Sequence, residues 1–332
     1  MKQFSASPPR RLRPRCQGLG LWVAIVVVAA SGTPTQAQPA GRPRALPSLV
    51  PAAASLRHED RVYRTTPQGD LSLHFSLPAD WKPSDRRPTI VFFFGGGWSQ
   101  GSYTQFVPQA DYFASRGMVA ASADYRIASI HHTTPDNCVE DAKAAVRWLR
   151  RNAADWGIDA VRIAAAGGSA GGHLAACTAL VPGFEPADDP VTSRPNALVL
   201  FNPALNIDEL ARARQIPPTL GIEVIEAITP NRFVAAGAPP AIMFFGTDDP
   251  LVAGAERYLE KAETLGVRAE LWMAAGQQHA FFNRPPWLQV TVRQADVFLR
   301  SLGYLEGEPT VALPPGPPSL TRRTAAAAGA TP

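Results

Sequence analysis

The sequence predicts an α/β fold with a mostly parallel central sheet and helices on both faces. Between about residues 61 and 302, short apolar runs alternate with longer segments of helical periodicity. The chain has 332 residues, of which 45% are hydrophobic and 18% charged, so it suits one domain of about 250 residues plus terminal segments. Three cysteines are too few for a disulfide-stapled scaffold or a cysteine-rich zinc protein.

Residues 1–37 are predicted to be an export signal. A basic stretch at 10–15 precedes an apolar run at 19–30, and the sequence TQA at 35–37 offers a cleavage site. An apolar run of about 12 residues is shorter than the roughly 20 that a spanning helix needs, which favours a cleaved signal over a retained anchor. We therefore expect an exported protein, periplasmic or secreted, with no stable membrane insertion.

The formal net charge of the whole chain is +4, and it depends on this N-terminal segment. Residues 1–37 carry five basic side chains and no acidic ones, which leaves +4 less +5, or −1, for the remainder. A near-neutral chain lacks the basic surface that nucleic acids or anionic membranes attract. We expect neither as a partner.

Two further segments are predicted to lie outside the catalytic domain, which we place at 61–305. Residues 38–60 have the composition of a linker, and residues 306–332 that of a disordered Pro- and Ala-rich tail. After the signal, two cysteines remain, Cys138 and Cys177. Export permits a disulfide between them, and two buried thiols are an equal alternative.

Seven strands and four helices are predicted in the middle of the chain. Alternating or continuous apolar runs predict strands at 71–77, 89–94, 118–123, 161–166, 197–201, 241–245 and 268–273. Helical spacing predicts helices at about 135–156, 171–180, 253–265 and 288–302. This order favours right-handed crossovers between parallel strands, and ligand sites in such sheets lie at the carboxyl ends of the strands.

The strand at 161–166 is followed by GGSAGGH at 167–173, which contains G-x-S-x-G. A sharp turn between a strand and a helix holds such a serine in a strained conformation, with glycines on either side to avoid clashes. The hydroxyl then lies exposed at a helix N-terminus, where developing negative charge is favoured. Ser169 is therefore the predicted nucleophile, and an ordinary serine in a glycine-rich turn is the alternative.

The strand at 89–94 is followed by three glycines, in FGGGW at 94–98. Backbone N–H groups there can face an oxyanion without an intervening Cβ. Gly95, Gly96 and the residue after the nucleophile, Ala170, are the predicted oxyanion donors. A phosphate-binding loop is the competing interpretation, but no phosphate-binding motif is present. Gly97 and Trp98 are candidates for the substrate pocket, and packing of the loop is the alternative for Trp98.

The predicted base is His279, in GQQHA after the strand at 268–273. A serine hydroxyl needs a nearby base, and the pKa of histidine suits that task. The chain contains six histidines. His173 is one helical turn past Ser169 and should point into packing, and the other four lie in segments far from a late strand end: His58, His74, His131 and His132.

The predicted acid is Asp249, in GTDDPL after the strand at 241–245. A carboxylate there would hold the imidazole tautomer and stabilise the imidazolium. Its neighbour Asp248 is the alternative. The chain order Ser169, Asp249, His279 matches one of the three common orders of serine triads.

Together these motifs resemble the α/β-hydrolase esterases of the hormone-sensitive-lipase-like and acetyl-esterase group. The resemblance covers about residues 61–302 and implies hydrolysis of short-chain carboxylic esters with no cofactor and no metal. It implies Ser169 as nucleophile, Asp249 as acid and His279 as base. The family often has a histidine before the three glycines that braces the loop, and here Phe94 takes its place. Compared with the linker at 38–60, the segment 206–232 is the better candidate for a lid.

We therefore expect an exported serine esterase, with a small ester or an acetylated polysaccharide as substrate. A prolyl-oligopeptidase-like peptidase shares the same core, but residues 38–60 leave no room for the propeller domain that such enzymes usually carry. A non-catalytic binding module on the same fold is the second alternative. Such a module would be expected to lack a triad position, and none is lacking here.

Overall fold

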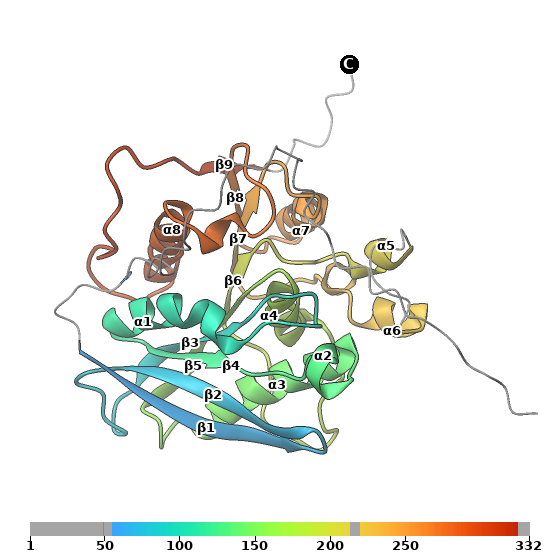
Figure 1. Cartoon of the computed structure of the whole chain (residues 1–332), viewed down its shortest axis with the longest axis horizontal. Coiled ribbons are helices and arrows are strands. Elements are labelled where there is room, and N and C mark those ends of the chain that lie inside the picture. The colour runs from blue at the N-terminus through green and yellow to red at the C-terminus, as the bar shows by residue number, and fades with distance from the viewer. Residues whose placement is uncertain (1–48, 50–54, 213–219, 325–332) are drawn as a thin grey trace, which may run out of the picture. The chain divides into compact units, whose positions relative to one another are not determined.

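The central feature of the structure is a nine-stranded, mostly parallel sheet (Figure 1). The computed structural model describes residues 49, 55–212 and 220–324. The strand order is β1-β2-β4-β3-β5-β6-β7-β8-β9. Six neighbouring strands in this order, β4, β3, β5, β6, β7 and β8, are parallel. The strands β1, β2 and β9 join antiparallel at the two edges. This confirms the predicted fold class.

The strands follow the apolar runs of the sequence closely. Those that the motifs follow, β3, β5, β7 and β8, have their carboxyl ends at one edge of the sheet because all four are parallel. The bounds of the nine strands are β1 Leu56–Thr66, β2 Gly69–Pro78, β3 Arg87–Phe93, β4 Val119–Ala123, β5 Ile158–Gly168, β6 Ala197–Phe201, β7 Ala241–Gly246, β8 Ala269–Ala274 and β9 Thr321–Arg323.

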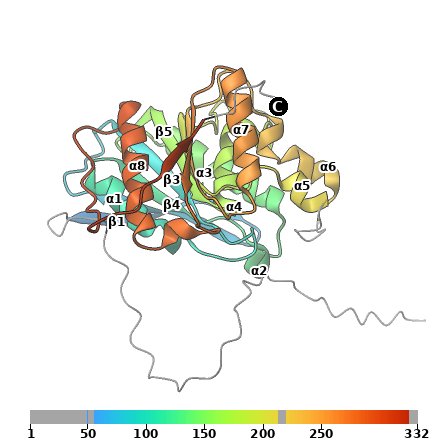
Figure 2. The same cartoon turned by 90° about the horizontal axis from the view of Figure 1, so that it is seen from above.

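Helices cover both faces of the sheet. α1 and α8 lie on one face, and α3, α4 and α7 lie on the other (Figure 2). None of the helices in the described segments has both the length and the apolar character needed to cross a membrane. The helices are α1 Val107–Ser115, α2 Ala128–His131, α3 Pro135–Arg151, α4 Ala170–Leu180, α5 Ile207–Arg212, α6 Ile222–Ala227, α7 Val252–Thr264 and α8 Trp287–Ser301, with 3-10 turns η1 Tyr103–Phe106, η2 Pro230–Arg232 and η3 Phe281–Asn283.

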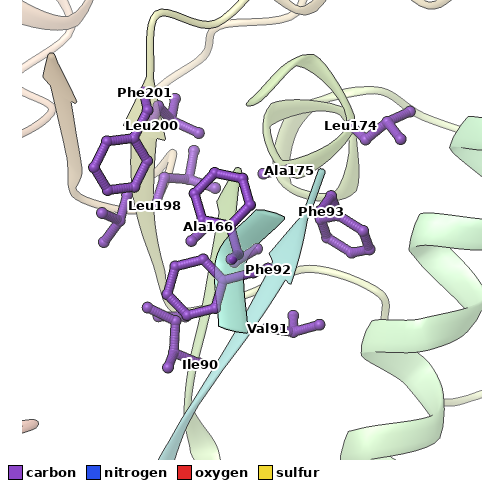
Figure 3. Close-up of a cluster of buried hydrophobic side chains, with 14 of the residues drawn as sticks. Ile90, Val91, Phe92, Phe93, Ala166, Leu174, Ala175, Leu198, Leu200 and Phe201 are labelled. Atoms are coloured by element: carbon purple, nitrogen blue, oxygen red, sulfur yellow. The ribbon is translucent and has the colours of Figure 1, made fainter. Parts of the chain in front are cut away.

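The core lies on both faces of the central strands. Along β3, Val91 and Phe93 point toward α4, whereas Phe92 points to the opposite face (Figure 3). Alternate residues of a strand face opposite sides, so a strand covered on both faces reads as a continuous apolar run. On the second face, Phe92 stacks on Phe106 with ring centroids 5.2 Å apart, and Phe282 joins the same aromatic group. This packing supports the strand ends at which the motifs begin.

The predicted linker at 38–60 is wrong for its last five residues. Residues 56–60 begin β1, which pairs antiparallel with β2. Six of the eleven side chains of β1 are exposed and five are charged, so the apolar pattern that indicates a strand is missing. Backbone pairing with the apolar neighbour β2 provides the order instead. The predicted signal, 1–37, lies outside the described residues.

The predicted disorder of the tail at 306–332 is wrong for residues 306–324. Arg116 donates hydrogen bonds to the carbonyls of Glu306 and Gly307, and Val311 is buried. Further on, β9 pairs antiparallel with the edge strand β8. The composition of the segment does not predict this order, because specific tertiary contacts hold it in place rather than a local apolar periodicity. Residues 325–332 lie outside the described part of the chain.

Candidate active site

Ser169 lies in the sharp turn between β5 and α4, as the motif predicts. Its backbone is strained, with φ 54° and ψ −118°. Gly171 permits the close approach of helix and sheet, because a Cβ there would come within 2.0 Å of the carbonyl oxygen of Phe93. A side chain at Gly167 would likewise meet the Gly171 carbonyl oxygen at 2.4 Å. The glycines of the motif are therefore required by the turn.

His279 links the serine to a carboxylate. Its Nε2 atom lies 2.8 Å from Ser169 Oγ, and its Nδ1 atom lies 2.8 Å from Asp249 Oδ2. Because a carboxylate accepts hydrogen bonds, Nδ1 carries the proton and Nε2 is left to accept from the serine hydroxyl. The structure thus brings together three side chains that are 30 to 110 residues apart in the chain.

The geometry distinguishes the two candidate aspartates. Asp249 is buried, with 2% of its surface exposed, and its second oxygen accepts the N–H of Leu251 at 2.9 Å. Asp248 is exposed, and its carboxylate accepts a hydrogen bond from the neighbouring Thr247 hydroxyl. The carboxylate that contacts the imidazole is therefore that of Asp249.

The glycine loop after β3 packs directly against this serine. A Cβ at Gly95 would lie 3.0 Å from the Gly168 carbonyl oxygen and 3.4 Å from Ser169 Cβ. The Gly95 N–H, however, donates to Gln105 Oε1 at 2.6 Å. The prediction of Gly95 as an oxyanion donor is therefore wrong, because a side chain of the protein already takes this N–H.

Around this serine, the backbone N–H groups of Gly96, Gly97 and Ala170 donate to no acceptor in the hydrogen bonds of turns, loops and side chains found among the described residues. Gly96 and Gly97 have φ of 128° and 61°, in the region that favours glycine. A Cβ at Gly97 would meet open space, and a place for this residue in the substrate pocket stays a prediction. These N–H groups are the candidate oxyanion donors, since Gly96 and Gly97 follow the Gly95 that packs on Ser169, and Ala170 follows the serine in the chain.

Comparison with known proteins decides the family. A family model described as BD-FAE matches residues 73–198. Carboxylesterase NlhH of Mycobacterium tuberculosis is 30% identical to this chain, over 71% of this chain and 78% of that protein. The propionate-bound structure of esterase 2 from Thermogutta terrifontis is 43% identical, with a TM-score of 0.70, over 76% of this chain and 96% of that one. This chain belongs to the α/β-hydrolase carboxylesterases. The resemblance to the hormone-sensitive-lipase-like group is thereby confirmed.

In this carboxylesterase Trp98 braces the glycine loop. Its side chain is buried, with 7% exposed, and its indole N–H donates to His173 Nδ1 at 3.2 Å. His173 in turn donates through Nε2 to the Ile228 carbonyl oxygen at 2.7 Å. Burial lowers the pKa of His173 to about 4, so the ring is neutral and keeps one donor and one acceptor. The packing alternative for Trp98 is therefore correct, and His173 packs as predicted.

The esterase site also contains Asn202, which the sequence analysis missed. This residue directly follows β6 and is fully buried. Its Oδ1 accepts the N–H of Ala280 at 3.1 Å, and its Nδ2 lies 3.4 Å from His279 Nε2. A polar residue immediately after the continuous apolar run ALVLF is the signal that would have found it, because β6 ends at the same edge of the sheet.

The remaining histidines of the esterase lie outside this site. His58 lies in β1 and contacts Asp111, and His74 lies in β2 between Asp60 and Asp124. Two more belong to α2 and its C-cap, rather than to a loop: His131 and His132. Within the described ranges, no group of histidine, cysteine and acidic side chains is placed to hold a metal ion.

The two cysteines that follow the predicted signal are free thiols. Cys138 and Cys177 are both buried. Cys138 Sγ lies 3.0 Å from the Arg126 carbonyl oxygen, and Cys177 Sγ lies 3.3 Å from His173 Nε2. Of the two alternatives left by the sequence, the pair of buried thiols is the correct one.

Proposed function

We propose that this carboxylesterase hydrolyses esters of short-chain carboxylic acids through an acyl-enzyme on Ser169, with His279 as base and Asp249 as orienting acid. The observation that carries the proposal is the pair of 2.8 Å contacts that His279 makes, one to the serine and one to the aspartate. This is the relation of nucleophile, base and orienter that acyl transfer requires.

In the first half of the reaction, Ser169 Oγ attacks the ester carbonyl carbon while its proton passes to His279 Nε2. The carbonyl oxygen becomes an oxyanion, and Asp249, bonded to Nδ1, stabilises the imidazolium. When the tetrahedral intermediate collapses, the bond to the alcohol oxygen breaks and Nε2 returns its proton to that oxygen. The alcohol leaves, and the acyl group stays on Ser169.

In the second half, water attacks the acyl carbon and gives a proton to His279 Nε2. Collapse releases the carboxylic acid and returns the proton to Ser169 Oγ. In both halves the N–H groups of Gly96, Gly97 and Ala170 are the proposed oxyanion donors. Losing one such donor typically costs about 2.7–4 kcal/mol of transition-state stabilisation.

A short acyl group is the proposed substrate feature. Solved structures of the 43% identical Thermogutta terrifontis esterase 2 contain bound propionate and bound butyrate. Acetyl groups on a polysaccharide belong to the same class of short esters, and we extend the proposal to them. Profiling acetate, butyrate and octanoate esters beside acetylated xylan tests this point, and faster cleavage of octanoate would contradict it.

Ser169→Ala tests the proposed nucleophile. The variant should lower kcat for a chromogenic acetate by about 10³-fold or more, because among the described residues no other hydroxyl lies at His279 Nε2. Ser115→Ala is the matched control, since Ser115 bonds only to the carbonyl of its own helix and should keep wild-type activity. Full activity in Ser169→Ala would reject the proposal.

Two further assays distinguish the esterase from the two alternative functions. Hydrolysis of a prolyl chromophore faster than of a chromogenic acetate would favour a peptidase. Failure of a fluorophosphonate probe to label folded protein would favour a binding module. Reactivity toward organophosphates in a similar enzyme supports the esterase proposal, since the Thermogutta terrifontis enzyme is phosphonylated by sarin and phosphorylated by paraoxon.

We further propose that the enzyme is exported, periplasmic or secreted, and that residues 1–37 are removed on the way. The basic stretch, apolar run and TQA sequence at 35–37 support this. Expression in a bacterial host followed by cell fractionation and N-terminal sequencing tests it. A mature N-terminus after Ala37 is expected, and full-length protein confined to the cytoplasm would contradict it.

A further inference from the structure

The peptide that joins Phe94 to Gly95 is held on both sides. Its N–H donates to Gln105 Oε1 at 2.6 Å, and its carbonyl oxygen accepts the hydroxyl of Tyr125 at 2.8 Å. The Tyr125 ring also stacks on Phe94, with centroids 4.1 Å apart. Two side chains from η1 and from the segment after β4 therefore fix the orientation of one peptide plane at the start of the glycine loop.

This peptide directly precedes the proposed oxyanion donors. Gly96 and Gly97 have no side chains through which their surroundings could orient them, and both have positive φ. The Gly97 N–H is oriented within the loop, because the carbonyl oxygen of its own peptide accepts the N–H groups of Ser99 and Gln100, both at 3.1 Å. The direction of the Gly96 N–H depends on the Phe94–Gly95 peptide that precedes it. Because a Cβ at Gly95 would lie 3.4 Å from Ser169 Cβ, a rotation of this peptide would displace backbone next to the nucleophile.

Gln105 also reaches the histidine loop. Its Nε2 donates to Asn283 Oδ1 at 3.2 Å, and Asn283 Nδ2 donates to the Ala280 carbonyl oxygen at 3.2 Å. Ala280 is the residue after His279. A continuous set of side-chain amide bonds thus connects the glycine loop with the loop that carries the base.

We propose that Gln105 is a positioning residue that, with Tyr125, holds the Phe94–Gly95 peptide so that the next N–H, that of Gly96, faces the oxyanion. This inference rests on the proposed function. The constraint on the loop comes from outside it, through Gln105 and Tyr125.

The test compares Gln105→Met and Tyr125→Phe, which remove one bond each and keep the size of the side chain. Each should lower kcat for a chromogenic acetate about 10- to 100-fold, with KM nearly unchanged, because the donors are displaced only slightly. The inhibition constant of a trifluoromethyl ketone, which forms an oxyanion on the enzyme, should rise by the same factor as kcat/KM falls.

The double variant tests whether both bonds act on the same peptide. Once one bond is lost the peptide is already free to rotate, so the double variant should lose little more than the worse single variant. Gln109→Met is the matched control: Gln109 is buried, and within the described segments its amide has no polar partner. It should keep wild-type kcat.

Titration of active sites with a fluorophosphonate separates positioning from folding. A merely structural role would lower the melting temperature or the number of sites and leave kcat per site unchanged, which would overturn the proposal. Wild-type kcat and wild-type inhibition in Gln105→Met would overturn it as well. If Gln105→Met does not fold, Tyr125→Phe provides the same test. Failure of the proposed function is a separate result, since the wild type would then not hydrolyse the ester.

Discussion

At the scale of single residues, the site depends on which of two adjacent carboxylates is turned inward. The backbone after β7 buries Asp249 against His279 and leaves Asp248 in solvent. A buried carboxylate bonded to Nδ1 fixes the tautomer that leaves Nε2 free to accept a proton. The proposed chemistry therefore requires the charge at position 249 and does not depend on the charge at position 248.

Asp249→Asn and Asp248→Asn form a matched pair that tests this assignment. Asp249→Asn should lower kcat by about 10³- to 10⁴-fold, because the amide favours the wrong imidazole tautomer. Asp248→Asn should leave kcat close to the wild-type value. Steady-state hydrolysis of a chromogenic acetate measures both, and a larger loss in Asp248→Asn would contradict the assignment.

Sequence alone predicts Ser169, His279 and Asp249 because each follows an apolar strand in a recognisable local motif. It does not predict Gln105, since a glutamine in a short turn carries no signal of which backbone N–H it will reach. That bond is set by how η1 lies against the end of β3. For the same reason the sequence assigns an oxyanion role to Gly95, whose N–H the folded chain has already used.

At the scale of elements, α4 joins the proposed nucleophile to two other segments through His173. The ring accepts from Trp98 in the glycine loop and donates to Ile228, which follows α6. The bond from Trp98 requires a neutral imidazole, because a protonated Nδ1 could not accept it. The sequence predicts the burial of His173 from its place one turn past Ser169, but its two partners come from loops whose paths the sequence does not determine.

The low pKa of His173 predicts how stability depends on pH. In the unfolded chain the pKa is near 6.5, and in the fold burial lowers it to about 4. Between these values the unfolded chain binds more protons, so the stability present above pH 6.5 is lost as pH falls toward 4. This one group should remove roughly 2 kcal/mol from the free energy of unfolding between pH 7.5 and pH 5.

Urea unfolding of the wild type and of His173→Asn at both pH values measures this contribution. The asparagine variant should be less stable than the wild type at pH 7.5 and should lack the pH-dependent part. The stability difference between the two proteins should therefore shrink at pH 5. An equal difference at both pH values would show that His173 does not titrate between the folded and unfolded states as described.

At the scale of the whole molecule, the tail completes the sheet. β9 pairs with β8 at three positions, and Arg323 forms a 2.7 Å ion pair with Glu256 of α7. The pattern of strands and helices predicts the central parallel sheet, because each buried strand is a local apolar run. It does not predict the edges, since β1 is charged and β9 is three residues long in a Pro- and Ala-rich segment.

Deletion of residues 320–332 should expose the edge of β8. An uncovered edge strand offers unpaired N–H and C=O groups to a second chain, so the truncated enzyme should self-associate with rising concentration. Sedimentation velocity over a concentration series measures this. Arg323→Ala removes the ion pair and keeps β9, and it should behave as the wild type. An unchanged sedimentation coefficient for the truncated enzyme would contradict a protective role for β9.

The most direct test of the account is the site and rate of labelling by a fluorophosphonate, read by peptide mass spectrometry. We predict one adduct, on the peptide that contains Ser169, and labelling at least about 10³-fold slower in His279→Ala because the base is lost. An adduct on another residue, or equal labelling rates in the wild type and His279→Ala, would contradict the claim that Ser169 is activated by His279.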